Sequence, residues 1–158
     1  MARYVIDAPT LLHLVDAGLA VHPGHQLVAP NSLRSAALEL LLSEVRTGKR
    51  TEAAALEAHE RMTGLKLRLL GDRVSRRVAW QLAREHDWST LRDAEYLAVT
   101  RLQADALVTV DPALAAVARD IVPVAALGGL LAPGPPPRLS ALASPGVRLR
   151  LPRLRAAA

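Results

Sequence analysis

Short apolar runs alternate with helical stretches along this chain of 158 residues, and that alternation restricts the possible folds more than any other feature. Runs such as "YVID" near the start and "ALVTVD" after residue 105 are continuously apolar, which is typical of strands buried on both faces of a sheet. Five strands are predicted, at 4–6, 27–30, 65–70, 106–110 and 121–127, and the run "LKLRLL" at 65–70 is predicted from its alternation of apolar and basic residues.

The segments between these runs predict helices. One follows Pro9 and ends at Gly18, and Thr51 is expected to cap another. The helix that Thr51 caps is expected at 52–62. Further helices are expected at 32–46, with Asn31 or Ser32 as the cap, after "GDRV" at 71–74 and through Arg84, at 91–103 and at 112–119. Strands that alternate with helices in this way predict an α/β fold in three α/β/α layers, with a mainly parallel sheet covered on both faces.

The chain divides into a domain and a tail. A hydrophobic content of 51% fits one compact domain, which we place at residues 1–131, with a core built from Leu, Val and Ala. Residues 132–158 contain six prolines and no amphipathic period, so this basic Pro/Arg-rich segment is expected to be extended or disordered.

Charge and composition exclude several classes of protein. Absence of Cys rules out disulfides and thiolate zinc sites, and no apolar stretch approaches the ~20 residues of a membrane helix, so a cytoplasmic protein without membrane contact is expected. The net charge of +5 comes from five tail arginines, because all acidic residues lie at or before Asp120. The basic character of this tail has two alternative explanations: the tail docks RNA electrostatically, or its arginines reflect a GC-rich coding bias. With only four aromatic residues, base-stacking platforms are not expected.

Three aspartates stand where a shared site would form. Asp7 and Asp111 each follow a predicted strand, and the ligand crevice of an open parallel sheet lies beyond the carboxyl ends of its strands. Asp93 lies in the first turn of the helix that precedes the strand before Asp111. Each acid has an alternative role as a helix cap or a dipole partner. If all three converge, their repulsion favours a bound cation, and oxygen ligands favour Mg²⁺ or Mn²⁺.

The motifs "YVIDAPTLL" and "LRDAEYLAVTRLQADALVTVD", together with the order of strands and helices, resemble a PIN domain, in particular the VapC-type toxin ribonucleases of bacterial toxin–antitoxin pairs. The resemblance covers about residues 1–128. It implies a Mg²⁺- or Mn²⁺-dependent endoribonuclease that is inhibited by a cognate antitoxin covering its active site. It also implies that Asp7, Asp93 and Asp111 are the metal ligands and that Thr109 is a polar neighbour of the site. The alternative role of Thr109 is that of a strand residue favoured by its β-propensity.

The chain departs from the family pattern at two positions. The family places a Glu about six residues after the Pro of the second strand, and counting from Pro30 reaches Ala36. Glu39 lies one turn further along the same helix and is the candidate substitute, with a surface or packing position as its alternative role. Pro9 stands where relatives place a small hydroxyl residue. Metal binding is therefore better supported than turnover.

Other candidates follow from charge and exposure. Arg34 and Arg92 are the arginines expected to contact RNA phosphates, although solvated helix cations are their alternative reading. Glu44 is expected to be a solvated surface acid. His22 and His25 are expected to be exposed rather than ligands, because "HPGH" alone is a weak zinc motif.

Two other functions stay open beside the ribonuclease. The first is a catalytically degenerate PIN-like module that binds RNA or a protein partner without cleavage, and the second is a structural subunit. Leu/Ala-rich helices at 32–46 and 52–62 are expected to leave an apolar groove for a homodimer or for an antitoxin helix.

Overall fold

A computed structural model of the chain describes residues 1–131, so the predicted tail at 132–158 lies outside the described residues. The five strands form one sheet in the order β3-β2-β1-β4-β5, and every neighbouring pair is parallel. The strands are β1 (Ala2–Ile6), β2 (His25–Pro30), β3 (Arg68–Leu70), β4 (Ala106–Val108) and β5 (Val124–Ala125). The helices are α1 (Ala8–Asp16), α2 (Leu33–Arg46), α3 (Glu52–Gly64), α4 (Arg73–Glu85), α5 (Arg92–Gln103), α6 (Pro112–Ala118) and α7 (Leu127–Leu131).

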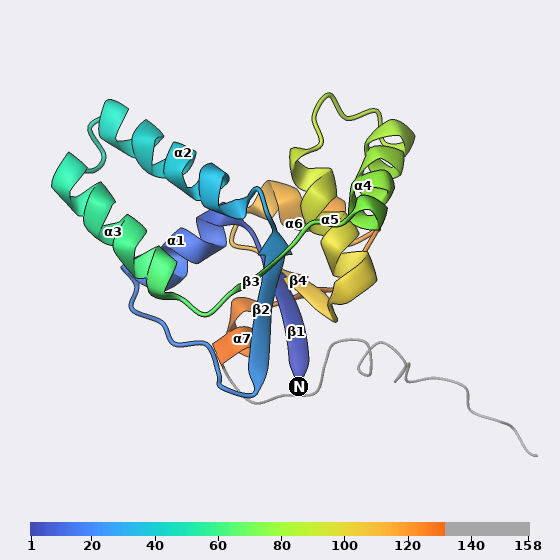
Figure 1. Cartoon of the computed structure of the whole chain (residues 1–158), viewed down its shortest axis with the longest axis horizontal. Coiled ribbons are helices and arrows are strands. Elements are labelled where there is room, and N and C mark those ends of the chain that lie inside the picture. Colours follow the sequence, from blue (N-terminus) through green and yellow to red (C-terminus); the bar gives the residue numbers. More distant parts are fainter. Residues whose placement is uncertain (132–158) are drawn as a thin grey trace, which may run out of the picture.

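The helices cover both faces of the sheet, which confirms the predicted α/β/α architecture. From β1 the chain steps outward to β2 and β3 through α1, α2 and α3, and it then returns past β1 to β4 through α4 and α5. Because parallel crossovers are right-handed, this reversal of direction places the two sets of helices on opposite faces. Figure 1 shows α1, α2 and α3 on one side of the sheet and α4 and α5 on the other.

The core lies between the sheet and these helices. The inner strands contribute side chains such as Val5, Ile6 and Leu107, none of which is exposed to solvent. Helix α5 packs against β1, β2 and β4 and buries Leu97 and Val99 over them. The core is built from Leu, Val and Ala as expected, with Tyr4 and Tyr96 as its buried aromatic residues within 1–131.

Several predicted boundaries are confirmed. Asp7 caps α1, Gly18 follows it with a φ of +62° that favours glycine, and the Thr51 hydroxyl accepts a hydrogen bond from the amide of Ala54 at the start of α3. Ser32 precedes α2 but makes no capping hydrogen bond.

Three predicted strands differ from the structure. The run at 65–70 pairs only over Arg68–Leu70, and the run at 106–110 stops at Val108 because the next residues turn toward Asp7. The run at 121–127 contributes only the two-residue β5 and is followed by the unpredicted helix α7, "LGGLL". The carbonyl of Leu130 in α7 accepts a hydrogen bond from the amide of His22, which ties this helix to the loop before β2.

Candidate functional site

The direction of the strand order reverses between β1 and β4. In doubly wound sheets, ligands bind at such a switch point, in the crevice beyond the carboxyl ends of the strands. Asp7 follows β1 directly, and Asp111 lies three residues after β4. The topology therefore places these two aspartates on either side of the switch point, although they are 104 positions apart in the sequence.

Asp7 is held rigidly at this point. Its residue is only 4% exposed, and its Oδ1 accepts hydrogen bonds from the amide and from the hydroxyl of Thr10. Its Oδ2 accepts a hydrogen bond of 2.7 Å from the hydroxyl of Thr109. A buried carboxylate needs such partners to offset its lost hydration, so the three hydrogen bonds fix both the position and the orientation of the group.

Two threonines connect Asp7 to the segment after β4. The Thr10 Oγ1 that donates to Asp7 also accepts a hydrogen bond of 3.0 Å from the amide of Val110. The Thr109 Oγ1 likewise donates to Asp7 and accepts a hydrogen bond of 3.0 Å from the amide of Asp111. Thr109 is thus a polar neighbour of Asp7, as expected. Thr10 was not predicted, and it supplies a hydroxyl close to the position where Pro9 lacks one.

Asp111 and Asp93 approach Asp7 from two further elements. Asp111 caps α6 by accepting a hydrogen bond of 2.9 Å from the amide of Ala113, and Asp93 stands in the first turn of α5. Burial raises the pKa of the Asp93 carboxyl, repulsion from Asp111 and Asp7 adds to the increase, and the Arg92 guanidinium opposes it. Asp93 is exposed as a whole residue, but its carboxyl faces a cleft where neighbouring atoms reduce its hydration. The three charges therefore interact across one space.

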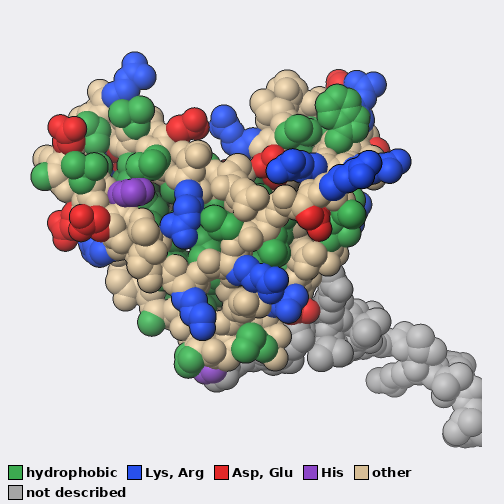
Figure 2. All heavy atoms as spheres, viewed as in Figure 1, with side chains coloured by type: hydrophobic (Ala, Val, Ile, Leu, Met, Phe, Trp, Pro, Cys, Tyr) green, Lys and Arg blue, Asp and Glu red, His purple; other side chains and the backbone are tan. Residues whose placement is uncertain are grey.

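That space is an open cleft of about 550 Å³ at the carboxyl edge of the sheet. Figure 2 shows the molecule hollowed at this edge, between the part that contains α2 and α3 and the part that contains α4 and α5, with acidic and basic side chains on the rim. The residues that line the cleft are Asp7, Ala8, Pro9, Ala36, Glu39, Leu40, Thr90, Arg92, Asp93, Tyr96, Asp111 and Leu114. Four of the predicted acids and Arg92 thus share one cavity.

Helix α2 contributes both positions relevant to the expected glutamate. Ala36 and Glu39 line the same cleft, with Ala36 half-buried and Glu39 exposed. The side chain of Glu39 starts about 4.5 Å further along the helix axis than Ala36. A carboxylate is therefore available at the rim from Glu39. Ala36, the position where the PIN-domain resemblance implies a glutamate, carries only a methyl group.

The hydroxyl of Tyr96 is a further polar group of the cleft that the sequence reasoning missed. It is buried and makes no hydrogen bond to any residue within 1–131. Burial and repulsion from Asp7 raise the pKa of this phenol, so it remains a neutral donor at physiological pH. The sequence contains a signal for this placement. Tyr96 lies three residues after Asp93, and residues three apart share one face of a helix.

The donor set suits a hard divalent cation, but the structure holds no ready-made cage. Within residues 1–131, no three His, Asp or Glu side chains are close enough together to form an ion site. Asp7 is anchored by hydrogen bonds, whereas the Asp93 carboxylate accepts no hydrogen bond from the described residues. Carboxylate oxygens that repel one another around a buried hydroxyl fit Mg²⁺ or Mn²⁺ chemically, and the cation would draw Asp93 and Asp111 toward Asp7.

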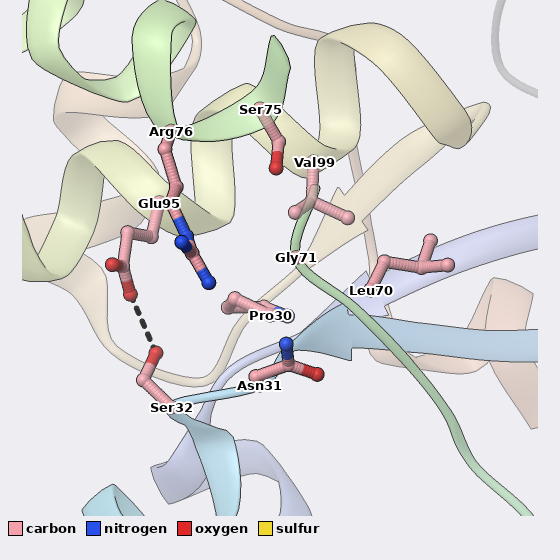
Figure 3. Close-up of a pocket in the computed structure, with 9 residues that line it drawn as sticks. All are labelled: Pro30, Asn31, Ser32, Leu70, Gly71, Ser75, Arg76, Glu95 and Val99. Atoms are coloured by element: carbon pink, nitrogen blue, oxygen red, sulfur yellow. Dashed lines mark hydrogen bonds between the residues drawn. The ribbon is translucent and has the colours of Figure 1, made fainter. Parts of the chain in front are cut away.

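Ser32 links the two helices that flank the cleft. Its hydroxyl donates a hydrogen bond of 2.6 Å to Oε2 of Glu95, which joins the start of α2 to the first turn of α5 (Figure 3). Ser32 therefore takes the N-cap position, one of the two that were expected, but its side chain bonds across the rim rather than to the amides of its own helix.

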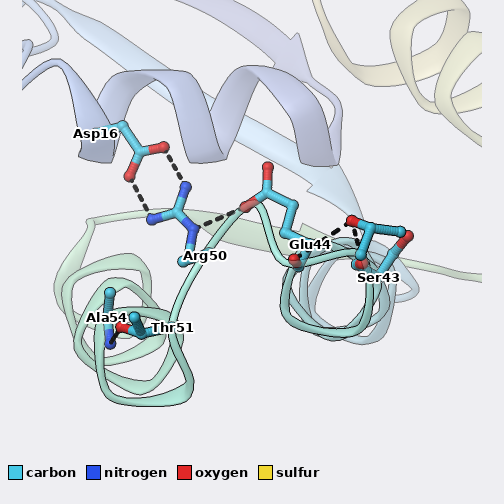
Figure 4. A network of polar contacts seen from close by, with 7 residues as sticks. Asp16, Ser43, Glu44, Arg50, Thr51 and Ala54 are labelled. Atoms are coloured by element: carbon cyan, nitrogen blue, oxygen red, sulfur yellow. Dashed lines mark hydrogen bonds and ion pairs between the residues drawn. The ribbon is translucent and has the colours of Figure 1, made fainter.

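Other predicted residues lie away from the cleft. Arg34 is exposed on α2 and is not among the cleft-lining residues. Glu44 is not the solvated acid that was expected. Its Oε2 accepts a hydrogen bond of 2.7 Å from Nε of Arg50. The other two guanidinium nitrogens of Arg50 form a bidentate ion pair with Asp16 of α1 (Figure 4). Arg50 therefore ties the loop between α2 and α3 to the end of α1, and Glu44 serves the fold.

The two histidines of "HPGH" are half-buried rather than exposed. The Nδ1 of His22 accepts a hydrogen bond of 3.0 Å from the amide of Gly24, and the rings of His22 and His25 lie 5.3 Å apart. The ring of His25 also packs edge-on against Tyr4. Since these contacts lie at the amino end of β2, the histidines take no part in the cleft.

Comparison with known proteins supports the fold. The chain is similar to the crystal structure of PAE2754 from Pyrobaculum aerophilum, with a TM-score of 0.61 and 23% sequence identity over 89% of this chain and 98% of that one. No family model matches the sequence, and no curated protein matches it either. Within residues 1–131, no helix has both the length and the apolar character needed to cross a membrane.

Proposed function

We propose that this protein is a metal-dependent endoribonuclease of the PIN type that hydrolyses RNA phosphodiesters, and that it is the toxin of a type II toxin–antitoxin pair. The observation that carries the proposal is the meeting of Asp7, Asp93 and Asp111 in one cleft at the switch point of a parallel sheet. Helix capping explains Asp7 and Asp111 one at a time, but it does not explain why Asp93 faces the same space at the cost of a raised pKa.

Each residue of the cleft has its own role in the proposed reaction. Asp7, Asp93 and Asp111 would hold Mg²⁺ or Mn²⁺, with Asp7 oriented by Thr10 and Thr109. The cation would supply Lewis acidity, polarising a phosphoryl oxygen and lowering the pKa of a water molecule. The neutral Tyr96 hydroxyl is buried beneath the cleft and has no acceptor among the described residues, so it would donate to a group that binds at the bottom of the cleft. Arg92, at the mouth of the cleft, would contact a flanking phosphate.

Cleavage of a labelled RNA by the purified chain tests the proposal. With Mn²⁺ or Mg²⁺ the wild type should cut the RNA, and Asp7→Asn or Asp93→Asn should lower the rate about 100-fold or more. Asp120→Asn is the matched control, because this exposed aspartate lies outside the cleft. An absence of metal-dependent cleavage, or equal rates in all variants, would refute the ribonuclease.

A second function is favoured by the methyl group at position 36. A degenerate PIN-like module would bind RNA or a protein without cutting, because Ala36 faces the cleft where the family carries a carboxylate. Ala36→Glu distinguishes the two functions. If the wild type is inactive and Ala36→Glu cleaves RNA, the protein is a module that lost only one ligand. If the wild type is active and Glu39→Gln abolishes that activity, Glu39 is the substitute for the missing glutamate.

The proposed partners follow from the same reading. Helices α2 and α3 expose Leu38, Leu42 and Leu56 by 44%, 59% and 59%, which suits contact with an antitoxin helix or with a second copy of the chain. Leu42→Glu should weaken such an assembly, as measured by its mass in solution. An RNA substrate would place the activity in the cytoplasm.

A further inference from the structure

The outer face of α4 carries four arginines and one tryptophan. Arg76 and Arg77 lie four and three residues before Trp80, Arg84 lies four residues after it, and Arg73 lies a turn further back. Residues three and four apart are neighbours on a helix surface, so all five side chains share one face. We call Arg73, Arg76, Arg77, Trp80 and Arg84 the α4 platform.

Trp80 is the unusual member of this face. It is 61% exposed, whereas the other tryptophan, Trp88, is half-buried and stacked on the ring of His86. Burying an indole ring is strongly favourable, so an exposed one among charged side chains indicates a surface that receives a ligand. The low aromatic content predicts no stacking platform, and within residues 1–131 Trp80 is the one exposed side chain among the Trp and Tyr residues.

The charges of the α4 platform are not neutralised within the described residues. All four arginines are exposed, and none of them forms an ion pair with any residue in 1–131. The acids of this region are Asp72 and Glu85 at the two ends of the helix and Glu95 of α5, which lines the same small pocket as Arg76 without forming an ion pair with it. From Arg73 to Arg84 the platform extends about 16 Å along the helix axis, so it forms a positive strip with a π surface in its middle.

One end of the α4 platform lies beside the starts of α2 and α5, the helices that flank the cleft. Arg76 points into a small pocket of about 100 Å³ that lies against the Ser32–Glu95 hydrogen bond between α2 and α5 (Figure 3). Glu95 lies in the first turn of α5, the helix that also carries Asp93 and Tyr96 of the cleft, although Glu95 itself is not among the cleft-lining residues. Figure 2 shows basic side chains gathered over the region where Figure 1 draws α4. A strand leaving the cleft over α5 would therefore meet the platform.

We propose that the α4 platform binds single-stranded RNA that extends from the cleft, with one base stacked on Trp80 and phosphates contacted by the arginines. This combination of an aromatic surface and unpaired cations is the chemistry that holds single strands without sequence preference. The inference rests on the proposed function, because it names the surface that receives the flanking substrate.

Binding of a fluorescein-labelled 12-nucleotide single-stranded RNA to the full-length protein, in EDTA to prevent cleavage, tests this site. Trp80→Ala should weaken binding about 5- to 150-fold, the range for loss of one stacked base. The matched control is Val117→Ala, which removes an exposed apolar side chain from α6 outside the cleft and outside the platform, and which should bind as the wild type does. Replacing Arg77 and Arg84 with Gln should lower the slope of log affinity against log salt by about 1.4, and Arg119→Gln should change it by no more than half of that.

Fluorescence supplies an independent readout of stacking. In Trp88→Phe, Trp80 is the remaining tryptophan, and poly(U) should quench its emission if a base stacks on it. Unchanged emission together with wild-type affinity in Trp80→Ala would overturn the proposal. Dissociation of a dimer by Trp80→Ala with unchanged RNA affinity would also overturn it, since the face would then bind protein.

The outcomes separate this inference from the proposed function. Metal-dependent cleavage with normal RNA affinity in Trp80→Ala would keep the ribonuclease and remove the platform. Weakened binding in Trp80→Ala without any cleavage by the wild type would keep the platform as an RNA-binding surface and remove the ribonuclease.

Discussion

Thr10→Val is the substitution that most directly tests how the candidate site is built. The Thr10 side chain is fully buried, and its hydroxyl donates to Asp7 Oδ1 while accepting the amide of Val110. Valine has nearly the same shape but lacks this hydroxyl. The variant loses one hydrogen bond to a charged group, worth about 1.5–3 kcal/mol, and leaves the Val110 amide without its partner at a cost of about 1 kcal/mol.

The expected loss of unfolding free energy is therefore about 2.5–4 kcal/mol, measured by urea unfolding followed by circular dichroism. Thr10→Ser is the control, because it keeps the hydroxyl and removes one buried methyl group, which costs about 1 kcal/mol. A double-mutant cycle with Asp7→Asn should reveal coupling between the two side chains. If Thr10→Val costs no more than Thr10→Ser, the hydroxyl does not anchor Asp7.

Further predictions concern charge and pH. Arg50→Ala should lower the unfolding free energy by about 1–2 kcal/mol at pH 7, because it breaks the bridge from Asp16 to Glu44. Arg50 holds the pKa of the Asp16 carboxyl below its ordinary value. The loss should therefore shrink when unfolding is measured at pH values below about 4. Equal losses at pH 7 and pH 3 would contradict this. Asp93 has a raised pKa, so its ionisation costs stability as the pH rises above about 4, and Asp93→Asn should melt at a higher temperature than the wild type at pH 7 but not at pH 3.

The layers of the fold could be predicted because apolar runs and caps are local signals. Thr51 and Gly18 mark helix ends through their own chemistry, and the continuous burial of β1 follows from three successive apolar residues. Helix α7 could not be predicted, since its two glycines disfavour a helix and tertiary contacts, such as the hydrogen bond from His22 to Leu130, stabilise it.

The acids of the site could be predicted from their places after strands, but its hydrogen bonds could not. The bond from Thr109 to Asp7 spans 102 positions in the sequence, and it depends on the side-by-side pairing of β1 and β4. The exposure of Trp80 likewise depends on which face of α4 packs against α5, because both faces of that helix contain apolar residues.

The central claim is that Asp7, Asp93 and Asp111 bind one divalent cation, and a Mn²⁺ titration followed by thermal unfolding tests it most directly. Mn²⁺ at about 100 times its dissociation constant should stabilise the wild type by about 2.7 kcal/mol. Asp93→Asn should lose most of this effect, while Asp120→Asn keeps it. An equal shift in wild type and Asp93→Asn, or no shift in any variant, would contradict the claim and leave the three aspartates as helix-start residues that merely share a cleft.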